Sequence, residues 1–329
     1  MNKHGSFPNT RLRRLRQSAK LRNLVQETQL TVSDLVLPLF IKAGRGIKKP
    51  IPSMPGHFQF SIDFLEAEIK AITALGIKSI LLFGIPADKD PLGQDSYSDN
   101  GLIQTAIPLI KKLAPELLVI SDLCFCEYTD HGHCGFIDKD QQLDNDQTLA
   151  LLVKQALSHA KSGVDIIAPS GMIDGMIQAI RQGLDAAGHH QIPLLSYAVK
   201  YASSLYGPFR DAAEGAPQFG DRRTHQMNYA NVEEALRECA LDVSEGADML
   251  MVKPAHTYLD VICRVKQAHP ALPLGAYHTS GEFAMIKAAS EKGWIDERSS
   301  VLEILTSIRR AGADFIITYF AKDVAEWLA

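Results

Sequence analysis

Two lysines stand directly after short apolar runs, where a positive charge is costly. Lys253 follows the apolar residues 249–252, and Lys200 follows the run that begins at Pro193. A continuous apolar run is typical of a strand buried on both faces. Burial disfavours the charged form of a lysine, and a neutral amine can attack a carbonyl carbon to form an imine. The pair therefore indicates Schiff-base chemistry, whereas one such lysine alone would be expected to extend its amine into solvent.

A second group that could carry chemistry is formed by Cys124, Cys126 and Cys134. Their spacing differs from that of zinc fingers, which use cysteine pairs two to four residues apart and four ligands. Three thiolates leave the fourth position of a zinc ion open to water or substrate, as in catalytic zinc sites. We therefore expect a catalytic zinc ion, with His131 and His133 beside the ligands and not bound to the metal.

A long segment rich in glycine, proline and arginine, residues 201–227, follows Lys200. Connections of this length are typically lids or disordered segments. Arg210, Arg222 and Arg223 lie in this segment, and a guanidinium group suits bidentate binding of a carboxylate. The sequence therefore predicts a lid over an anionic substrate.

The elements that must position these residues alternate along the chain. Apolar runs predict strands at 36–41, 79–83, 118–122, 165–168, 193–197, 249–252, 274–277 and 315–319. Amphipathic patterns predict helices at 62–75, 102–113, 146–162, 174–187, 232–245, 259–269, 282–292 and 299–310. This alternation indicates an α/β protein with a parallel sheet, and eight repeats indicate a closed (β/α)8 TIM barrel, with an open doubly wound sheet as the alternative. Active sites of such barrels lie at the C-terminal ends of the strands.

Composition limits the class of protein. The chain has 329 residues, 46% of them hydrophobic and 22% charged, and a net charge of -4. These values indicate a soluble globular protein without membrane spans and argue against general nucleic-acid binding. An odd number of cysteines, five in all, suits a reducing compartment, so a cytoplasmic location is expected. The basic residues 11–16 allow a transit peptide, a solvated arm or an arm that contacts a neighbouring subunit.

Several of these motifs together resemble those of the porphobilinogen synthase family, also called 5-aminolevulinate dehydratase. The resemblance covers nearly the whole chain, and its motifs are residues 251–255, 200–203, 206–212 and 131–135. It implies condensation of two molecules of 5-aminolevulinate to porphobilinogen with loss of two waters, an early step of tetrapyrrole synthesis. It also implies an octamer of barrels, which favours reading residues 1–33 as an oligomerisation arm and 34–329 as the catalytic barrel.

The resemblance also implies a role for individual residues. Lys253 would form the imine with the substrate that supplies the propionate side, and Lys200 would hold the second substrate. Asp122 and Ser170 would assist proton transfer. Carboxylate-binding positions are matched by Ser280 and Tyr319 for the first substrate, and by Arg210, Arg222 and Gln226 for the second. The three cysteines match the zinc-binding form of the family, and Glu238 occupies the place of an allosteric magnesium ligand.

Two other functions are compatible with parts of the pattern. A class I aldolase also uses a barrel lysine, although it needs no metal. A zinc-stabilised scaffold or binding protein would use the cysteines only to hold a loop.

Overall fold

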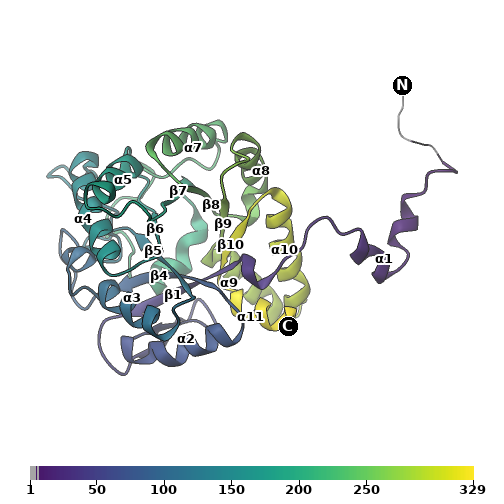
Figure 1. Ribbon diagram of the computed structural model, residues 1–329, viewed down its shortest axis with the longest axis horizontal. Coiled ribbons are helices and arrows are strands. Elements are labelled where there is room, and N and C mark those ends of the chain that lie inside the picture. The colour runs from purple at the N-terminus through teal and green to yellow at the C-terminus, as the bar shows by residue number, and fades with distance from the viewer. Residues whose placement is uncertain (1–4, 6) are drawn as a thin grey trace.

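The computed structural model describes residue 5 and residues 7–329. Eight parallel strands form a barrel with helices around it (Figure 1). The strands are β1 (Leu35–Lys42), β4 (Ser79–Ile85), β5 (Leu118–Leu123), β6 (Ile166–Pro169), β7 (Leu195–Lys200), β8 (Met249–Lys253), β9 (Leu274–His278) and β10 (Phe315–Thr318). They pair in the order β6-β5-β4-β1-β10-β9-β8-β7, and a parallel bridge from Ile167 to Leu194 joins the two ends. The predicted (β/α)8 barrel is therefore confirmed, and the open sheet is excluded.

Burial explains why these strands form. β1 and β4 are buried along almost their whole length, because one face fills the barrel and the other packs against helices. The buried strand residues are mostly aliphatic, and fully buried examples on the helix-facing side are Leu37, Ile80 and Ile167. The polar residues that end several strands are thus exceptions within an apolar frame.

The outer layer of the barrel contains the predicted helices, with small shifts of their ends. These helices are α2 (Leu65–Ala74), α3 (Leu102–Leu113), α4 (Asn145–Lys161), α5 (Met176–Ala186), α7 (Glu233–Glu245), α8 (Leu259–Ala268), α9 (Ser280–Glu291) and α10 (Glu297–Ala311). Strict alternation fails at the last repeat, because α9 and α10 both lie between β9 and β10. The helix that follows the eighth strand is α11 (Ala321–Leu328), which the sequence analysis missed. Its short apolar face, including the buried Val324, packs beside β1.

A small hairpin was also missed. β2 (Lys48–Pro50) and β3 (Phe58–Phe60) pair antiparallel, and β3 adds to the end of β1. The residues of β2 are exposed, so this segment carries no apolar pattern that could predict a strand.

The N-terminal segment extends away from the barrel (Figure 1). It contains the 3-10 helix η1 (Leu12–Arg16) and α1 (Ala19–Leu24), and all residues of η1 are exposed. Residues 1–4 and 6 of the predicted arm lie outside the described residues. The other short helices are η2 (Val32–Asp34), η3 (Ile62–Phe64), η4 (Gln94–Tyr97), η5 (Ser204–Tyr206), η6 (His256–Tyr258) and α6 (Gly207–Ala212). None of the helices in the described part of the chain is long and apolar enough to cross a membrane.

Candidate active site

The two lysines predicted to form imines meet at one end of the barrel. Lys200 is the last residue of β7 and Lys253 the last of β8, and the two are direct partners in the register of these strands. Each side chain is only 5% exposed. The sequence places both at C-terminal strand ends, where parallel strands of a barrel bring their last residues together.

The amine of Lys253 has an environment that favours its neutral form. Burial, together with the charge of Lys200, lowers the pKa of Lys253 to about 7. The Nζ atom lies over four aromatic rings, with ring centroids at 4.1 Å for Tyr277, 5.2 Å for Tyr206 and Phe209, and 5.3 Å for Tyr197. Near neutral pH, a large fraction of the molecules therefore carry Lys253 as a neutral, nucleophilic amine.

Lys200 is held by a chain of polar groups. Its Nζ donates a hydrogen bond to the backbone oxygen of Ser170 at 2.5 Å, and the hydroxyl of Ser170 donates to Asp122 Oδ2 at 3.1 Å. Burial, with a smaller contribution from the neighbouring carboxyl of Glu127, raises the pKa of Asp122 to about 8. A carboxyl group with this pKa can both donate and accept a proton near neutral pH.

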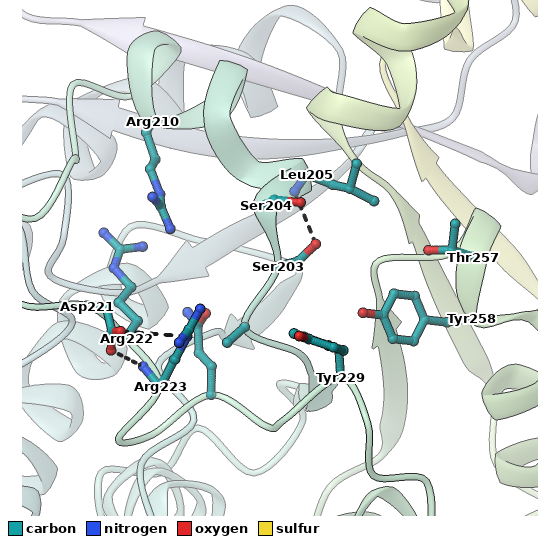
Figure 2. A pocket seen from close by; sticks show the side chains of 12 residues that line it. Ser203, Ser204, Leu205, Arg210, Asp221, Arg222, Arg223, Tyr229, Thr257 and Tyr258 are labelled. Carbon is teal, nitrogen blue, oxygen red and sulfur yellow. Dashed lines mark hydrogen bonds and ion pairs between the residues drawn. The ribbon is translucent and has the colours of Figure 1, made fainter.

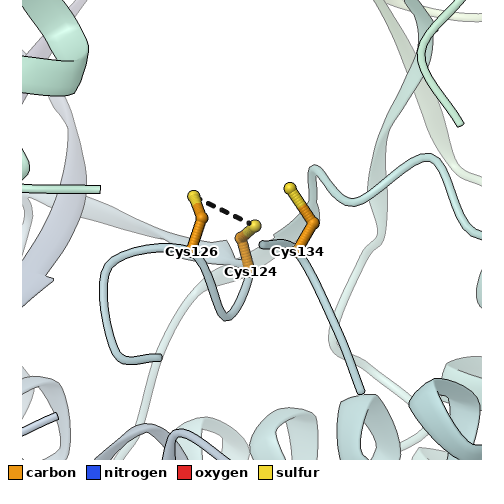
Figure 3. Close-up of side chains that lie close together, drawn as sticks. All are labelled: Cys124, Cys126 and Cys134. Atoms are coloured by element: carbon orange, nitrogen blue, oxygen red, sulfur yellow. Dashed lines mark hydrogen bonds between the residues drawn. The ribbon is translucent and has the colours of Figure 1, made fainter. Parts of the chain in front are cut away.

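The three predicted metal ligands converge immediately after β5. Cys124, Cys126 and Cys134 are buried, free of disulfide bonds, and carry sulfur atoms within 4.8 Å of one another (Figure 3). The Sγ atoms of Cys124 and Cys126 are 3.4 Å apart, and hydrogen bonds from both thiols hold the pKa of Cys134 well below its usual value. Three convergent thiols, one of them readily ionised, fit a soft metal such as zinc. Within the described residues, this is the one group of three or more histidine, cysteine or acidic side chains that could hold a metal.

The histidines of the cysteine loop contact backbone groups. His133 Nε2 pairs with the backbone oxygen of Phe219 at 3.0 Å, and its ring packs on Phe219 at 4.5 Å. His131 Nε2 pairs with the backbone oxygen of Pro91 at 3.2 Å. His133 therefore connects the cysteine loop to the segment 201–227, a contact that spacing within the loop could not indicate.

The segment 201–227 covers the C-terminal end of the barrel. Arg222 is buried and donates from Nη2 to the backbone oxygens of Gly132 at 2.9 Å and Gly215 at 2.6 Å. Glu214 provides a second attachment, since its carboxylate accepts from Lys42 Nζ at 2.7 Å and from Gln59 Nε2 at 3.1 Å. These contacts fix the segment to the cysteine loop and to the hairpin beside β1.

Most of the predicted residues line two neighbouring cavities. Asp122, Cys126, Ser170, Lys200, Arg222 and Lys253 line an inner chamber with about 10 Å³ of free space. Arg210, Arg222, Arg223 and Gln226 line an outer cavity of about 640 Å³, with Tyr229 and Tyr258 on its opposite side (Figure 2). Arg222 belongs to both. The inner chamber has room for about one water molecule, so a larger ligand requires movement of its walls.

Two predicted carboxylate-binding residues lie beside the inner chamber. Ser280 Oγ accepts a hydrogen bond from the backbone N–H of Phe209 at 2.9 Å. The hydroxyl of Tyr319 pairs with that of Tyr277 at 3.0 Å. Both residues are buried, and each bonds to a residue whose ring lies near Lys253, Phe209 for Ser280 and Tyr277 for Tyr319.

Glu238 lies apart from the inner chamber, in a neighbouring cavity of about 440 Å³ that also contains Asp174, Glu234 and Gln226. Burial, followed by the charges of Asp174 and Glu234, raises the pKa of Glu238. Its carboxylate is not part of a convergent group of three metal ligands within the described ranges, residue 5 and 7–329.

Several residues of the inner chamber were missed by sequence reasoning. Glu127, Phe83, Tyr206 and Phe209 also line it. Glu127 accepts a hydrogen bond from Cys126 Sγ at 3.2 Å, and burial raises its pKa to about 8. Because Glu127 directly follows Cys126, a predicted metal ligand, the sequence could have identified it as a site residue. The aromatic residues carry no such signal, because rings of this kind are usually core residues.

Comparison with known proteins agrees with this geometry. The sequence model of the family described as delta-aminolevulinic acid dehydratase matches residues 9–327. The chain is 57% identical to the delta-aminolevulinic acid dehydratase of Halalkalibacterium halodurans, over 97% of this chain and 96% of that protein. It is 54% identical to the enzyme of Bacillus subtilis, over 97% and 98% of the two chains.

A solved structure gives the same result. The delta-aminolevulinic acid dehydratase (porphobilinogen synthase) of Toxoplasma gondii, crystallised with its reaction product porphobilinogen, superimposes with a TM-score of 0.94. The two sequences are 44% identical, over 97% of this chain and 91% of the other. The match to the family model and the identity to curated relatives, each over nearly the whole chain, show that this protein belongs to the delta-aminolevulinic acid dehydratase family.

Proposed function

We propose that this protein condenses two molecules of 5-aminolevulinate to porphobilinogen, with release of two water molecules, through imines on Lys253 and Lys200. The observation that carries this proposal is the pairing of two buried lysines across neighbouring strand ends, in a chamber that also contains an acid and a thiol. A class I aldolase uses one barrel lysine and no metal, so that function would not explain the second lysine or the three thiols.

Each lysine has a distinct part in this proposal. Lys253, whose pKa is about 7, supplies the neutral amine that attacks the ketone of the first substrate. Lys200 binds the ketone of the second substrate, so its hydrogen bond to Ser170 must break when that substrate enters. Asp122, within hydrogen-bond distance of Ser170, moves protons to and from the two amines.

The carboxylates of the two substrates are assigned to two different sets of residues. We infer that Ser280 and Tyr319, beside the rings around Lys253, bind the carboxylate of the first substrate. Arg210, Arg222 and Gln226 bind that of the second. All three residues have a spare donor, since Arg210 Nε, Arg222 Nε and Gln226 Nε2 have no partner in the described part of the protein. Unpaired donors in a cavity are suited to an incoming carboxylate.

The three cysteines would hold a zinc ion at the second substrate. When bound there, zinc supplies Lewis-acid chemistry and positions the substrate amine. The three thiols, their burial and their mutual distances support this assignment. Glu238 remains our proposal for an allosteric magnesium ligand, supported by the acidic side chains of Asp174 and Glu234 in the same cavity.

Three further proposals concern a lid, an oligomerisation arm and the cellular location of the protein. Residues 201–227 act as a lid, because the inner chamber is too small for substrate in its present form. Residues 1–33 form an arm of a homo-octamer, supported by exposed apolar residues on the arm, including Leu12, Leu15 and Leu24. The protein works in the cytoplasm, in keeping with free cysteines throughout the described residues.

The proposed function is tested by replacing each lysine and measuring porphobilinogen. Lys253→Met and Lys200→Met should each reduce its formation from 5-aminolevulinate by at least about a thousandfold, because each removes a nucleophile. Lys287→Met is a matched control, since Lys287 also lies over two rings, at 5.1 and 5.5 Å, but on α9. It should retain activity within about threefold. Normal activity in Lys253→Met would refute the proposal.

A further inference from the structure

The four rings around Lys253 form a cage that no role assigned above explains. Tyr197, Tyr206, Phe209 and Tyr277, called the ring cage below, all have centroids within 5.3 Å of Lys253 Nζ. Tyr277 is nearest at 4.1 Å. An aromatic face carries partial negative charge and attracts a cation within about 6 Å of its centroid.

The ring cage distinguishes Lys253 from its neighbour. Lys200 Nζ lies 5.7 Å from the centroid of Tyr197 and donates to the backbone oxygen of Ser170. Two lysines paired in register therefore have different surroundings. Lys200 Nζ has a hydrogen-bond acceptor, whereas Lys253 Nζ lies over aromatic faces.

A cage of rings does not favour every cation equally. The ammonium of a free lysine is a compact, strongly hydrated charge with three N–H donors, so aromatic faces replace its hydration poorly. A protonated imine carries one N–H, and its charge is shared between nitrogen and the former carbonyl carbon. Burial therefore costs the protonated imine less hydration energy than it costs the ammonium. The aromatic faces then stabilise the protonated imine more effectively. The same surroundings can thus keep the free amine neutral and its imine charged.

We propose that the ring cage stabilises the protonated imine of Lys253, and that Tyr277, whose face lies nearest the nitrogen, is a catalytic residue. The inference rests on the proposed function, because it requires an imine at Lys253. In the step concerned, the amine nitrogen bonds to the ketone carbon and the carbon–oxygen bond breaks. Amine, ketone and one proton give the protonated imine and one water molecule, with no change of oxidation state. The positive charge that remains lies at the nitrogen within the ring cage.

The four rings come from two parts of the structure. Tyr197 and Tyr277 belong to β7 and β9, whereas Tyr206 and Phe209 belong to the proposed lid. The ring cage is therefore complete only with the lid in the position seen here. Closure of the lid would stabilise charge at Lys253 when the imine forms.

The test varies the charge on the ring face without changing its shape. Tyr277 is replaced by phenylalanine, and then by 4-fluoro-, 3,5-difluoro- and 3,4,5-trifluorophenylalanine, in the full-length protein. Each variant is incubated with 4-oxopentanoate, which has the ketone and carboxylate of the substrate without its amine. Cyanoborohydride, which reduces protonated imines, then traps the adduct, and mass spectrometry measures its amount on Lys253. Tyr277→Phe is the reference because it already lacks the hydroxyl bonded to Tyr319.

The ring cage predicts a graded response. The concentration of 4-oxopentanoate that gives half-maximal trapping should rise with each added fluorine, on the order of fivefold over the series. The pH above which trapping declines should fall in the same order, which a purely structural role of Tyr277 would not produce. The same series at Phe209, a native phenylalanine of the ring cage, should give a smaller trend and serves if Tyr277→Phe does not fold.

Fluorination of Phe283 is the control. Phe283 is fully buried but packs on Phe320, at 4.5 Å, outside the ring cage, so its fluorination should leave trapping unchanged. Constant half-maximal concentrations in the Tyr277 and Phe209 series, with Lys253 still trapped, would overturn the inference and leave the proposed function standing. Absence of any Lys253 adduct in the unmodified protein would overturn both.

Discussion

Lys200 and Lys253 are direct register partners at the ends of β7 and β8, and both amines are buried in one chamber. After burial itself, the charge of Lys200 is the largest influence that lowers the pKa of Lys253. The second lysine is therefore part of what makes the first reactive.

Removing the neighbouring charge should make Lys253 less reactive. In Lys200→Met the pKa of Lys253 should rise, since a like charge no longer disfavours its protonated form. Competitive labelling with acetic anhydride between pH 5 and 10 measures this, and labelling of Lys253 at pH 7 should fall several-fold. If the pH at which half of Lys253 is labelled stays the same or falls in Lys200→Met, Lys200 is not the cause of the lowered pKa of Lys253.

The buried amine should also cost stability. The pKa of Lys253 falls from its ordinary 10.5 to about 7 on folding, so the unfolded chain binds more protons between these values. Stability therefore rises with pH across this window, and the penalty is complete below about pH 7. Lys253→Met should stabilise the protein by roughly 1–3 kcal/mol at pH 6, with a smaller gain at pH 9. Melting temperatures at both pH values measure this, and a gain that grows with pH would contradict the explanation.

The cysteine loop allows a test of metal content. Cys134→Ser should reduce bound zinc from about one per chain to nearly none, because two thiolates hold the ion poorly. Cys263→Ser is the matched control, since Cys263 lies half-buried on α8, away from the trio. Elemental analysis of dialysed protein measures both. Full zinc content in Cys134→Ser would refute the assignment of this ligand.

The attachment of the proposed lid can be weakened at one residue. Glu214→Gln removes the charge that pairs with Lys42 at 2.7 Å, a partly exposed contact of about 1 kcal/mol. The KM for 5-aminolevulinate should rise about three- to fivefold, and proteases should cleave residues 201–227 faster. Glu66→Gln, which breaks the exposed pair with Lys70 on α2, should change neither. Equal behaviour of the two variants would show that Glu214 does not hold the lid.

Local patterns in the sequence were sufficient for the barrel and for the strand-end residues. The apolar runs before Lys200 and Lys253 predict buried strands, and the fold then brings their ends together without further information. The three cysteines were identifiable for the same reason, because their spacing keeps them on one loop. Such features are determined by residues that lie close together in the sequence.

Other features depend on contacts between distant segments, and the sequence did not predict them. The ring cage combines Tyr277 of β9 with Tyr206 and Phe209 of the segment 201–227, and each ring alone resembles an ordinary core residue. The contact of His133 with the backbone oxygen of Phe219, 86 residues away, likewise could not be read from the cysteine loop. Exposed β2 and the short terminal α11 lack the periodic patterns on which such predictions rest.

If Lys253 and Lys200 each form an imine with substrate, reduction should leave a trapped adduct on both lysines. The full-length protein is incubated with isotopically labelled 5-aminolevulinate, reduced with borohydride, digested and analysed by mass spectrometry. Reduced adducts are expected on Lys253 and Lys200, with Lys253 still labelled in Lys200→Met. Turnover accompanied by adducts on neither lysine, or on a lysine outside the inner chamber, would contradict imine formation on these two lysines.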